Sequence, residues 1–255
     1  MNKEVLVPVG GFKLYAKLMG KKNGKPTVVM DAGYGDYSKA WDSIMEDVSK
    51  STQVVVYDRA GLGKSEKSPN PRTSLEMVKE LKELLNRLDM KPPYLLVGHS
   101  FGGVNVSVYA HEYPKEVAGL VLVDATPVDY RERFLPTMPE DFQEAYRKQF
   151  VREGNYEEFM ESLGQLKGYK ETLSMPVIVL AAGKKDHYSE ASQDLWNDMQ
   201  REMALISSKG EYELAKNSTH YIQRDEPEVV VRAVEKLVEL VCSNEKNETI
   251  STVYP

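Results

Sequence analysis

The stretch YLLVGHSFGG, residues 94–103, decides the fold. A short apolar run is followed by GHSFG, which matches the pattern G-x-S-x-G around Ser100, and then by a segment compatible with a helix. A serine at such a strand-to-helix turn holds a strained backbone conformation, so glycine is needed two residues before it and two residues after it. Gly98 and Gly102 meet that requirement. The pattern predicts that Ser100 projects its hydroxyl at the carboxyl edge of a sheet.

Short apolar runs rich in valine and leucine recur before and after this stretch, and such runs are typical of strands buried on both faces of a parallel sheet. They lie at residues 27–30, 53–57, 94–97, 120–123 and 177–180, with one more strand at 211–214. Two earlier strands, at 4–9 and 12–18, surround a Gly-Gly pair and form a hairpin. Helical patterns separate the later runs. The order predicts an α/β fold with a mostly parallel eight-stranded sheet and helices on both faces.

The 255 residues suffice for one α/β domain, which we place at residues 1–242. A segment of different character, at about 126–175, carries aromatic residues scattered among many charges and predicts a small helical cap. Phe142, Tyr146 and Phe150 recur every fourth residue and therefore share one helix face. We expect some cap aromatics to dock on the sheet and the rest to line a substrate pocket. Residues 243–255 are polar and predict a flexible tail.

The composition argues against several kinds of partner. The formal net charge of -6 comes without a long basic run, so we expect no nucleic acid partner. No segment approaches a membrane span or a secretory leader, so we expect no stable membrane insertion. Cys242 is the only cysteine, which fits a cytoplasmic protein, and the four histidines show no zinc-ligand spacing. We therefore expect neither metal nor cofactor, and the oligomeric state stays open.

The order of motifs resembles the α/β-hydrolase family over about residues 5 to 240, nearly the whole chain. The motifs are the hairpin, DAGYG at 31–35, DRAGLGKS at 58–65, GHSFGG at 98–103, the cap and a late histidine. The resemblance implies that Ser100 is a nucleophile, which needs an adjacent base and an acid that orients the base. Relatives with dehalogenase chemistry carry aspartate at this position, so that chemistry is disfavoured.

Four histidines are candidates for the base. His99 precedes the nucleophile and points elsewhere in such an elbow, His111 lies in the following helix, and His187 abuts an aspartate after a strand. His220 lies in the loop between the final strand and the last helix, where similar hydrolases carry their base. The resemblance therefore implies His220.

Two carboxylates between Ser100 and His220 directly follow strands, Asp124 and Asp186. The family order of nucleophile, acid and base allows either. We assign Asp186, because its loop follows the strand nearest the one that precedes His220, the arrangement that the resemblance implies. Asp124 is the alternative acid, since some relatives take the acid from the earlier strand, and otherwise it has a structural role.

Backbone donors for a substrate oxyanion are also implied by the resemblance. One is the N–H of Phe101, after the nucleophile, and the other is the N–H of Tyr34, after Gly33. Many relatives have His-Gly where this chain has Ala32-Gly33. Because the donor is a backbone N–H, we expect this difference to leave the oxyanion hole intact. The DRAGLGKS turn lacks the pattern of a phosphate loop, so we assign it no catalytic role.

The resemblance and the residues together predict a serine hydrolase of the carboxylesterase type, acting through an acyl-Ser100 intermediate. The expected partner is a small to medium hydrophobic acyl substrate. Other chemistries of the same scaffold are the first alternative, namely thioester or amide cleavage, perhydrolysis and carbon-carbon cleavage. A small-molecule receptor on the hydrolase fold is the second, and multiple turnover of p-nitrophenyl esters separates it from an enzyme.

Overall fold

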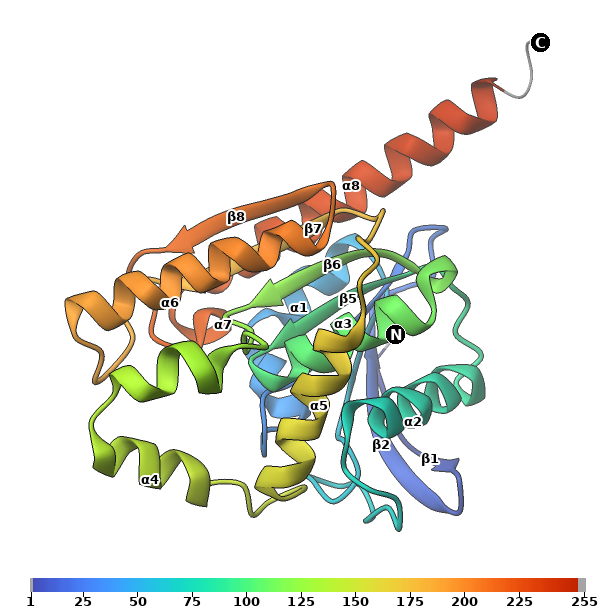
Figure 1. Ribbon diagram of the computed structural model, residues 1–255. Helices are drawn as coiled ribbons and strands as arrows, with labels where there is room; N and C mark the ends of the chain where they lie inside the picture. The colour runs from blue at the N-terminus through green and yellow to red at the C-terminus, as the bar shows by residue number, and fades with distance from the viewer. Residues whose placement is uncertain (1, 252–255) are drawn as a thin grey trace.

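An eight-stranded sheet forms the centre of the molecule (Figure 1). The computed structural model describes the backbone of residues 2–251 and the side chains of residues 2–243. The strands are β1 Asn2–Val9, β2 Phe12–Met19, β3 Thr27–Asp31, β4 Val54–Tyr57, β5 Tyr94–His99, β6 Val117–Val123, β7 Val177–Ala182 and β8 Gly210–Ala215. Each strand that the sequence predicts is present.

The strand order is β1-β2-β4-β3-β5-β6-β7-β8. The hairpin β1–β2 is antiparallel and joins β4 in an antiparallel pair, whereas every pair from β4 to β8 is parallel. The predicted mostly parallel sheet is confirmed. Because β3 lies between β4 and β5, the chain changes direction across the sheet there, and ligands of such sheets bind outside the carboxyl ends at this switch point.

Helices cover both faces of the sheet (Figure 1). The α-helices are α1 Asp42–Ser51, α2 Ser74–Arg87, α3 Phe101–Glu112, α4 Glu140–Lys148, α5 Tyr156–Gly168, α6 Glu190–Met203, α7 Ile222–Asp225 and α8 Pro227–Ser251. Short helical turns occur at Ser38–Trp41, Pro114–Glu116, Tyr130–Phe134, Leu135–Thr137 and Ala204–Ile206. Among residues 2–251, no helix is both long enough and apolar enough to cross a membrane.

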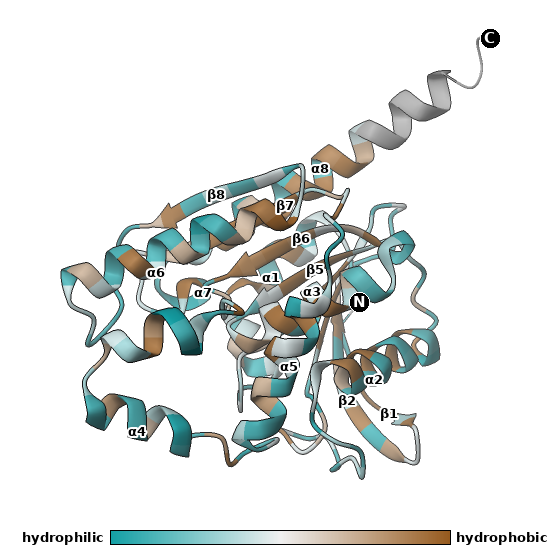
Figure 2. Ribbon diagram, in the orientation of Figure 1, coloured by the Kyte–Doolittle hydropathy of each residue, from teal (hydrophilic) through white to brown (hydrophobic). Residues whose placement is uncertain are grey.

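Alternate residues of the inner strands face two different cores. In β4, Val54 and Val56 belong to the cluster beneath α1 and α8, whereas Val55 and Tyr57 belong to the cluster beneath α2 and α3. Both sets are buried, which explains why the strand is apolar throughout rather than alternating. Figure 2 shows hydrophobic residues along β5, β6 and β7, whereas α4 is largely hydrophilic.

The insertion between β6 and β7 contains α4 and α5, as the cap prediction requires. α5 packs against α2 and α3 and carries Phe159 into a buried aromatic cluster with Phe101 and Phe150. α4 buries none of its residues fully, but its Phe142 and Tyr146 line the cavity described below. In the cap, α5 is therefore packed firmly on the rest of the domain, whereas α4 forms one wall of the cavity.

The last helix is longer than the sequence suggested. It extends from Pro227 to Ser251 and so includes the first part of residues 243–255, for which the sequence predicts a polar, flexible tail. Proline is well suited to the first turn of a helix because its missing N–H has no intrahelical partner there, and Pro227 begins this one. Residues 252–255 lie outside the described part of the chain.

Candidate active site

Ser100 occupies a strained turn between β5 and α3. Its backbone angles are φ 52° and ψ -118°, a conformation that residues with a side chain rarely adopt. A Cβ at Gly98 would lie 2.5 Å from the carbonyl oxygen of Gly102, and one at Gly102 would lie 2.2 Å from the carbonyl oxygen of Asp31. Glycine is therefore required at both positions, and the predicted elbow is confirmed.

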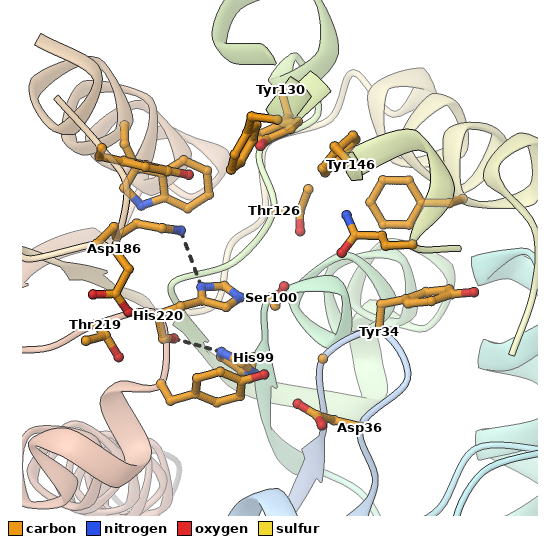
Figure 3. Close-up of a pocket in the computed structure, with 18 of the residues that line it drawn as sticks. Tyr34, Asp36, His99, Ser100, Thr126, Tyr130, Tyr146, Asp186, Thr219 and His220 are labelled. Atoms are coloured by element: carbon orange, nitrogen blue, oxygen red, sulfur yellow. Dashed lines mark hydrogen bonds between the residues drawn. The ribbon is translucent and has the colours of Figure 1, made fainter. Parts of the chain in front are cut away.

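The elbow opens into a cavity of about 340 Å³ at the carboxyl edge of the sheet. Ser100 and His220 both line this cavity, and Figure 3 shows them on the same side of it. No hydrogen bond joins the Ser100 hydroxyl to the imidazole of His220 among the described residues. In enzymes without substrate such contacts are often long and tighten only when substrate binds.

His220 lies in the turn between β8 and α7, as the sequence predicts. The turn is held by Asp225, which accepts hydrogen bonds from the backbone N–H of Thr219 at 2.8 Å and from its hydroxyl at 2.5 Å. The imidazole Nδ1 of His220 lies 2.6 Å from Oδ2 of Asp124. The side chain of His220 remains 32% exposed and lines the cavity.

The carboxylate in contact with the imidazole of His220 is Asp124, and not Asp186, which we expected from the sequence. Asp124 follows β6 and is completely buried, with the 2.6 Å contact to the imidazole. Asp186 follows β7 but is exposed at the cavity, and no hydrogen bond links it to His220 among the described residues. The reason is that Lys185, the preceding residue, turns inward and occupies the space beside the imidazole.

The carboxylate of Asp124 is held from several sides. Its Oδ1 accepts hydrogen bonds from the backbone N–H of Ala182 at 3.0 Å and from the indole N–H of Trp196 at 2.7 Å. Its Oδ2 accepts one from the ammonium of Lys185 at 2.9 Å. Burial by itself raises the pKa of Asp124, but the charge of Lys185 and the hydrogen bond with His220 outweigh it, so the pKa is lowered. Asp124 is therefore ionised and fixed in position.

Lys185 is a buried cation that the sequence reasoning missed. Its ammonium lies 3.3 Å from Nδ1 of His220 and 3.5 Å from the ring centre of Trp196, a cation–π contact. Burial lowers its pKa, while the charge of Asp124 opposes that shift. The sequence holds one signal for it, a lysine three residues after the end of β7 and directly before the candidate acid Asp186. Oδ2 of Asp124 therefore interacts with two groups, the ammonium of Lys185 and the imidazole of His220.

The protonation of His220 follows from these contacts. Burial, followed by the positive charge of Lys185, lowers its pKa, and the hydrogen bond to Asp124 acts in the opposite direction. The imidazole is therefore neutral at neutral pH. Its Nδ1–H donates to Asp124, because an ionised carboxylate can only accept, and its Nε2 is left as an acceptor for a serine proton.

His99 has a supporting position that the sequence analysis did not anticipate. Its Nε2 lies 2.9 Å from the backbone carbonyl oxygen of His220, which can only accept, so Nε2–H donates. The two rings are 4.6 Å apart between centres. Burial, then the nearby His220, lowers the pKa of His99 well below its usual value, which keeps the ring neutral. His99 therefore fixes the backbone of the candidate base.

The two residues whose backbone N–H groups are the candidate oxyanion donors, Tyr34 and Phe101, lie close to Ser100 in different ways. Phe101 is the first residue of α3, and Tyr34 lies in the loop after β3, where Gly33 lines the same cavity as Ser100. Neither N–H has a hydrogen-bond partner within residues 2–251. The N-terminus of a helix carries partial positive charge, so the Phe101 N–H is suited to an anionic oxygen.

Aromatic side chains form the outer walls of the cavity. The cap contributes Tyr130 and Tyr146 (Figure 3). Helix α6 contributes Trp196. The cap residues Phe142, Tyr146 and Phe150, which the sequence placed on one face, all line the cavity. Among the described side chains, no group of three or more His, Cys, Asp or Glu residues is arranged to hold a metal ion.

The family of the chain follows from comparison with known sequences. The model of the alpha/beta hydrolase fold family matches residues 26–160. The protein named "Uncharacterized protein YqjL" from Bacillus subtilis (strain 168) is 36% identical over 209 residues, covering 82% of this chain and 81% of its own. The chain belongs to the α/β hydrolase fold family.

Solved structures share the fold at low sequence identity. A thermophilic esterase from Thermogutta terrifontis superposes with a TM-score of 0.68 at 19% identity, covering 94% of this chain and 99% of its own. The haloalkane dehalogenase DatA from Agrobacterium tumefaciens C58 gives 0.66 at 16% identity, covering 94% and 97%. These two names describe different chemistries on one fold, so the reaction of this chain must be argued from its own site.

Proposed function

We propose that this protein is a serine hydrolase that cleaves carboxylic esters through an acyl-Ser100 intermediate. The observation that carries the proposal is the ionised, buried Asp124 in contact with His220, beside a serine on a strained elbow. A serine hydroxyl is a weak nucleophile until a neighbouring base takes its proton, and His220 is neutral and oriented for that task.

The reaction has two halves. His220 Nε2 accepts the Ser100 proton as the oxygen attacks the ester carbonyl, and Asp124 stabilises the resulting imidazolium. The N–H groups of Tyr34 and Phe101 bind the oxyanion that forms on the substrate. His220 then gives its proton to the leaving alkoxide, which departs as an alcohol and leaves the acyl-enzyme. Water, activated by the same imidazole, releases the carboxylic acid and restores Ser100.

The cavity favours a small to medium hydrophobic acyl group. Its volume of about 340 Å³ lies at the small end of ligand sites, and aromatic residues from the cap dominate its outer wall. Among the described side chains, Lys185 is the one lysine or arginine that lines it, and its ammonium is already bound to Asp124. A neutral ester therefore suits the site better than a multiply charged one.

Turnover of p-nitrophenyl esters of increasing chain length tests this function. We expect multiple turnover on acetate and butyrate esters and a loss of at least about a thousandfold in kcat for Ser100→Ala. A fluorophosphonate should add to intact wild-type protein in mass spectrometry and not to the variant. Circular dichroism on both proteins controls for folding.

Two results would contradict the proposal. Folded wild-type protein that neither turns over esters nor takes the label lacks an activated serine. Activity that survives Ser100→Ala would place the chemistry elsewhere. Ligand binding without turnover would favour the receptor alternative, and preference for thioesters or amides over esters would keep the mechanism but change the substrate.

A further inference from the structure

A buried cluster of three charged side chains lies behind the loop that carries Tyr34. Arg59 sits between Asp31 and Glu153, and the three side chains are 2%, 1% and 0% exposed. The guanidinium binds Glu153 through two parallel contacts, Nε to Oε2 at 2.7 Å and Nη2 to Oε1 at 2.6 Å, and also contacts Asp31. Arg59 belongs to the DRAGLGKS turn, to which the sequence assigned no catalytic role.

The same guanidinium holds the oxyanion loop by its backbone. Nη1 donates to the carbonyl oxygen of Ala32 at 2.6 Å, and Nη2 donates to that of Gly33 at 2.6 Å. In a trans peptide the C=O and the following N–H point in opposite directions. The Gly33 carbonyl points at Arg59, so the Tyr34 N–H of the same peptide points away from Arg59, and both Gly33 and Tyr34 line the cavity.

The cap reaches the same loop through a short segment, Arg152, Glu153 and Gly154, between α4 and α5. Oε1 of Glu153 accepts the backbone N–H of Gly35 at 2.8 Å, and the hydroxyl of Tyr34 donates to the carbonyl oxygen of Gly154 at 2.6 Å. A Cβ at Gly35 would lie 2.6 Å from the side chain of Arg152. The loop and this cap segment are thus packed and hydrogen-bonded as one unit.

A buried ion pair is weak evidence for stability, because its desolvation cost can equal the attraction between its charges. A carboxylate and a guanidinium are, however, strong and directional hydrogen-bonding groups. Here they converge on two carbonyls and one N–H of a single four-residue loop, 32–35. These contacts therefore fix the orientation of that loop, and their net contribution to the free energy of unfolding is small.

We propose that Arg59 and Glu153 are positioning residues that aim the Tyr34 N–H at the oxyanion, so that the cap sets the geometry of the oxyanion hole. The inference rests on the proposed function, because an oxyanion hole matters only if Ser100 forms a tetrahedral intermediate. A preorganised donor speeds the chemical step without changing ground-state binding of the ester in proportion.

The test compares Glu153→Gln with a matched control, Glu80→Gln. Glu80 forms another buried ion pair, with Arg72 at 2.7 Å and exposures of 7% and 9%, and it holds no group of residues 32–35. Both changes remove one buried charge and keep the side-chain shape. We expect Glu153→Gln to lower kcat on p-nitrophenyl butyrate about tenfold with KM within about threefold, and Glu80→Gln to change kcat less than about threefold.

A second readout measures the loop directly. Hydrogen exchange of the backbone amides of residues 33–36 should accelerate in Glu153→Gln and stay at the wild-type rate in Glu80→Gln. Glu153→Ala, which also removes the acceptor for the Gly35 N–H, should lower kcat further than Glu153→Gln. All rates are taken well below each variant's melting temperature, so that a general loss of stability does not enter kcat.

The outcomes separate this inference from the proposed function. Active wild-type protein with unchanged kcat and unchanged exchange in Glu153→Gln would overturn the positioning role and leave the hydrolase intact. Equal losses in Glu153→Gln and Glu80→Gln would show a general effect of buried charge and would also overturn it. If the wild-type protein had no esterase activity, there would be no oxyanion to stabilise, and both the proposed function and the positioning role would be overturned.

Discussion

The carboxyl ends of β6 and β7 lie side by side, and each is followed by an aspartate, yet the two carboxylates have opposite surroundings. Asp124 after β6 is buried, ionised and in contact with His220. Asp186, four residues beyond the end of β7, is exposed and forms no hydrogen bond or ion pair with the imidazole among the described side chains. The turn after β7 contributes a cation instead, Lys185. A strand end thus supplies a place for a carboxylate, and the side chains packed around that place determine whether it can orient a base.

The largest expected effect in this comparison is that of Asp124→Asn. The asparagine side-chain N–H₂ would donate to Nδ1 of His220, favouring the tautomer in which Nε2 carries the proton and cannot accept the one from Ser100. We expect kcat to fall by about 10³ to 10⁴ while KM changes little, measured on p-nitrophenyl butyrate. A loss of less than about tenfold in a folded variant would show that Asp124 is not the acid.

A smaller effect, visible mainly in the pH dependence, is expected for Lys185→Met. The charged groups that face His220 are Asp124, Lys185 and the more distant Asp36, and among them only Lys185 lowers the pKa of His220. Wild-type protein should therefore keep a neutral base below the usual histidine pKa of about 6.5. Removing the ammonium raises the pKa of His220, so the acid limb of kcat/KM should move to higher pH.

Lys184→Met is the matched control for that shift. Lys184 is the adjacent residue, carries the same charge and is exposed, so solvent screens it from the imidazole. We expect its pH profile to coincide with that of the wild type. An acid limb in Lys185→Met that stays in place, or moves to lower pH, would show that the ammonium does not govern the protonation of His220.

The smallest expected effect is that of Asp186→Asn. The side chain is exposed and has no hydrogen-bonding role toward His220. Substitutions at such positions usually change the free energy of unfolding by no more than about 0.5 kcal/mol, so the variant should stay folded. We expect kcat/KM within about twofold of the wild type on acetate and butyrate esters. If Asp186→Asn lost more activity than Asp124→Asn, the roles of the two strand ends would be reversed.

Much of the site could be predicted from local sequence. The pattern GHSFG after an apolar run fixes Ser100, because the elbow needs glycine at positions 98 and 102 whatever surrounds it. The resemblance to the α/β hydrolases implied the rest: His220 in the loop between the last strand and the last helix, and the backbone N–H groups of Tyr34 and Phe101. Only the inference about Ser100 concerns backbone geometry that neighbouring residues impose.

The sequence by itself therefore predicted the α/β fold and Ser100 as the candidate nucleophile, since hydrophobic periodicity and glycine placement are local signals, and the family resemblance added His220 as the candidate base. Only the tertiary structure decided between Asp124 and Asp186. That choice depends on Trp196 from α6 and Lys185 from the turn after β7, which meet Asp124 only when the chain is folded. The link from Glu153 in the cap to the loop 32–35 spans more than a hundred residues, and no local pattern encodes such a contact.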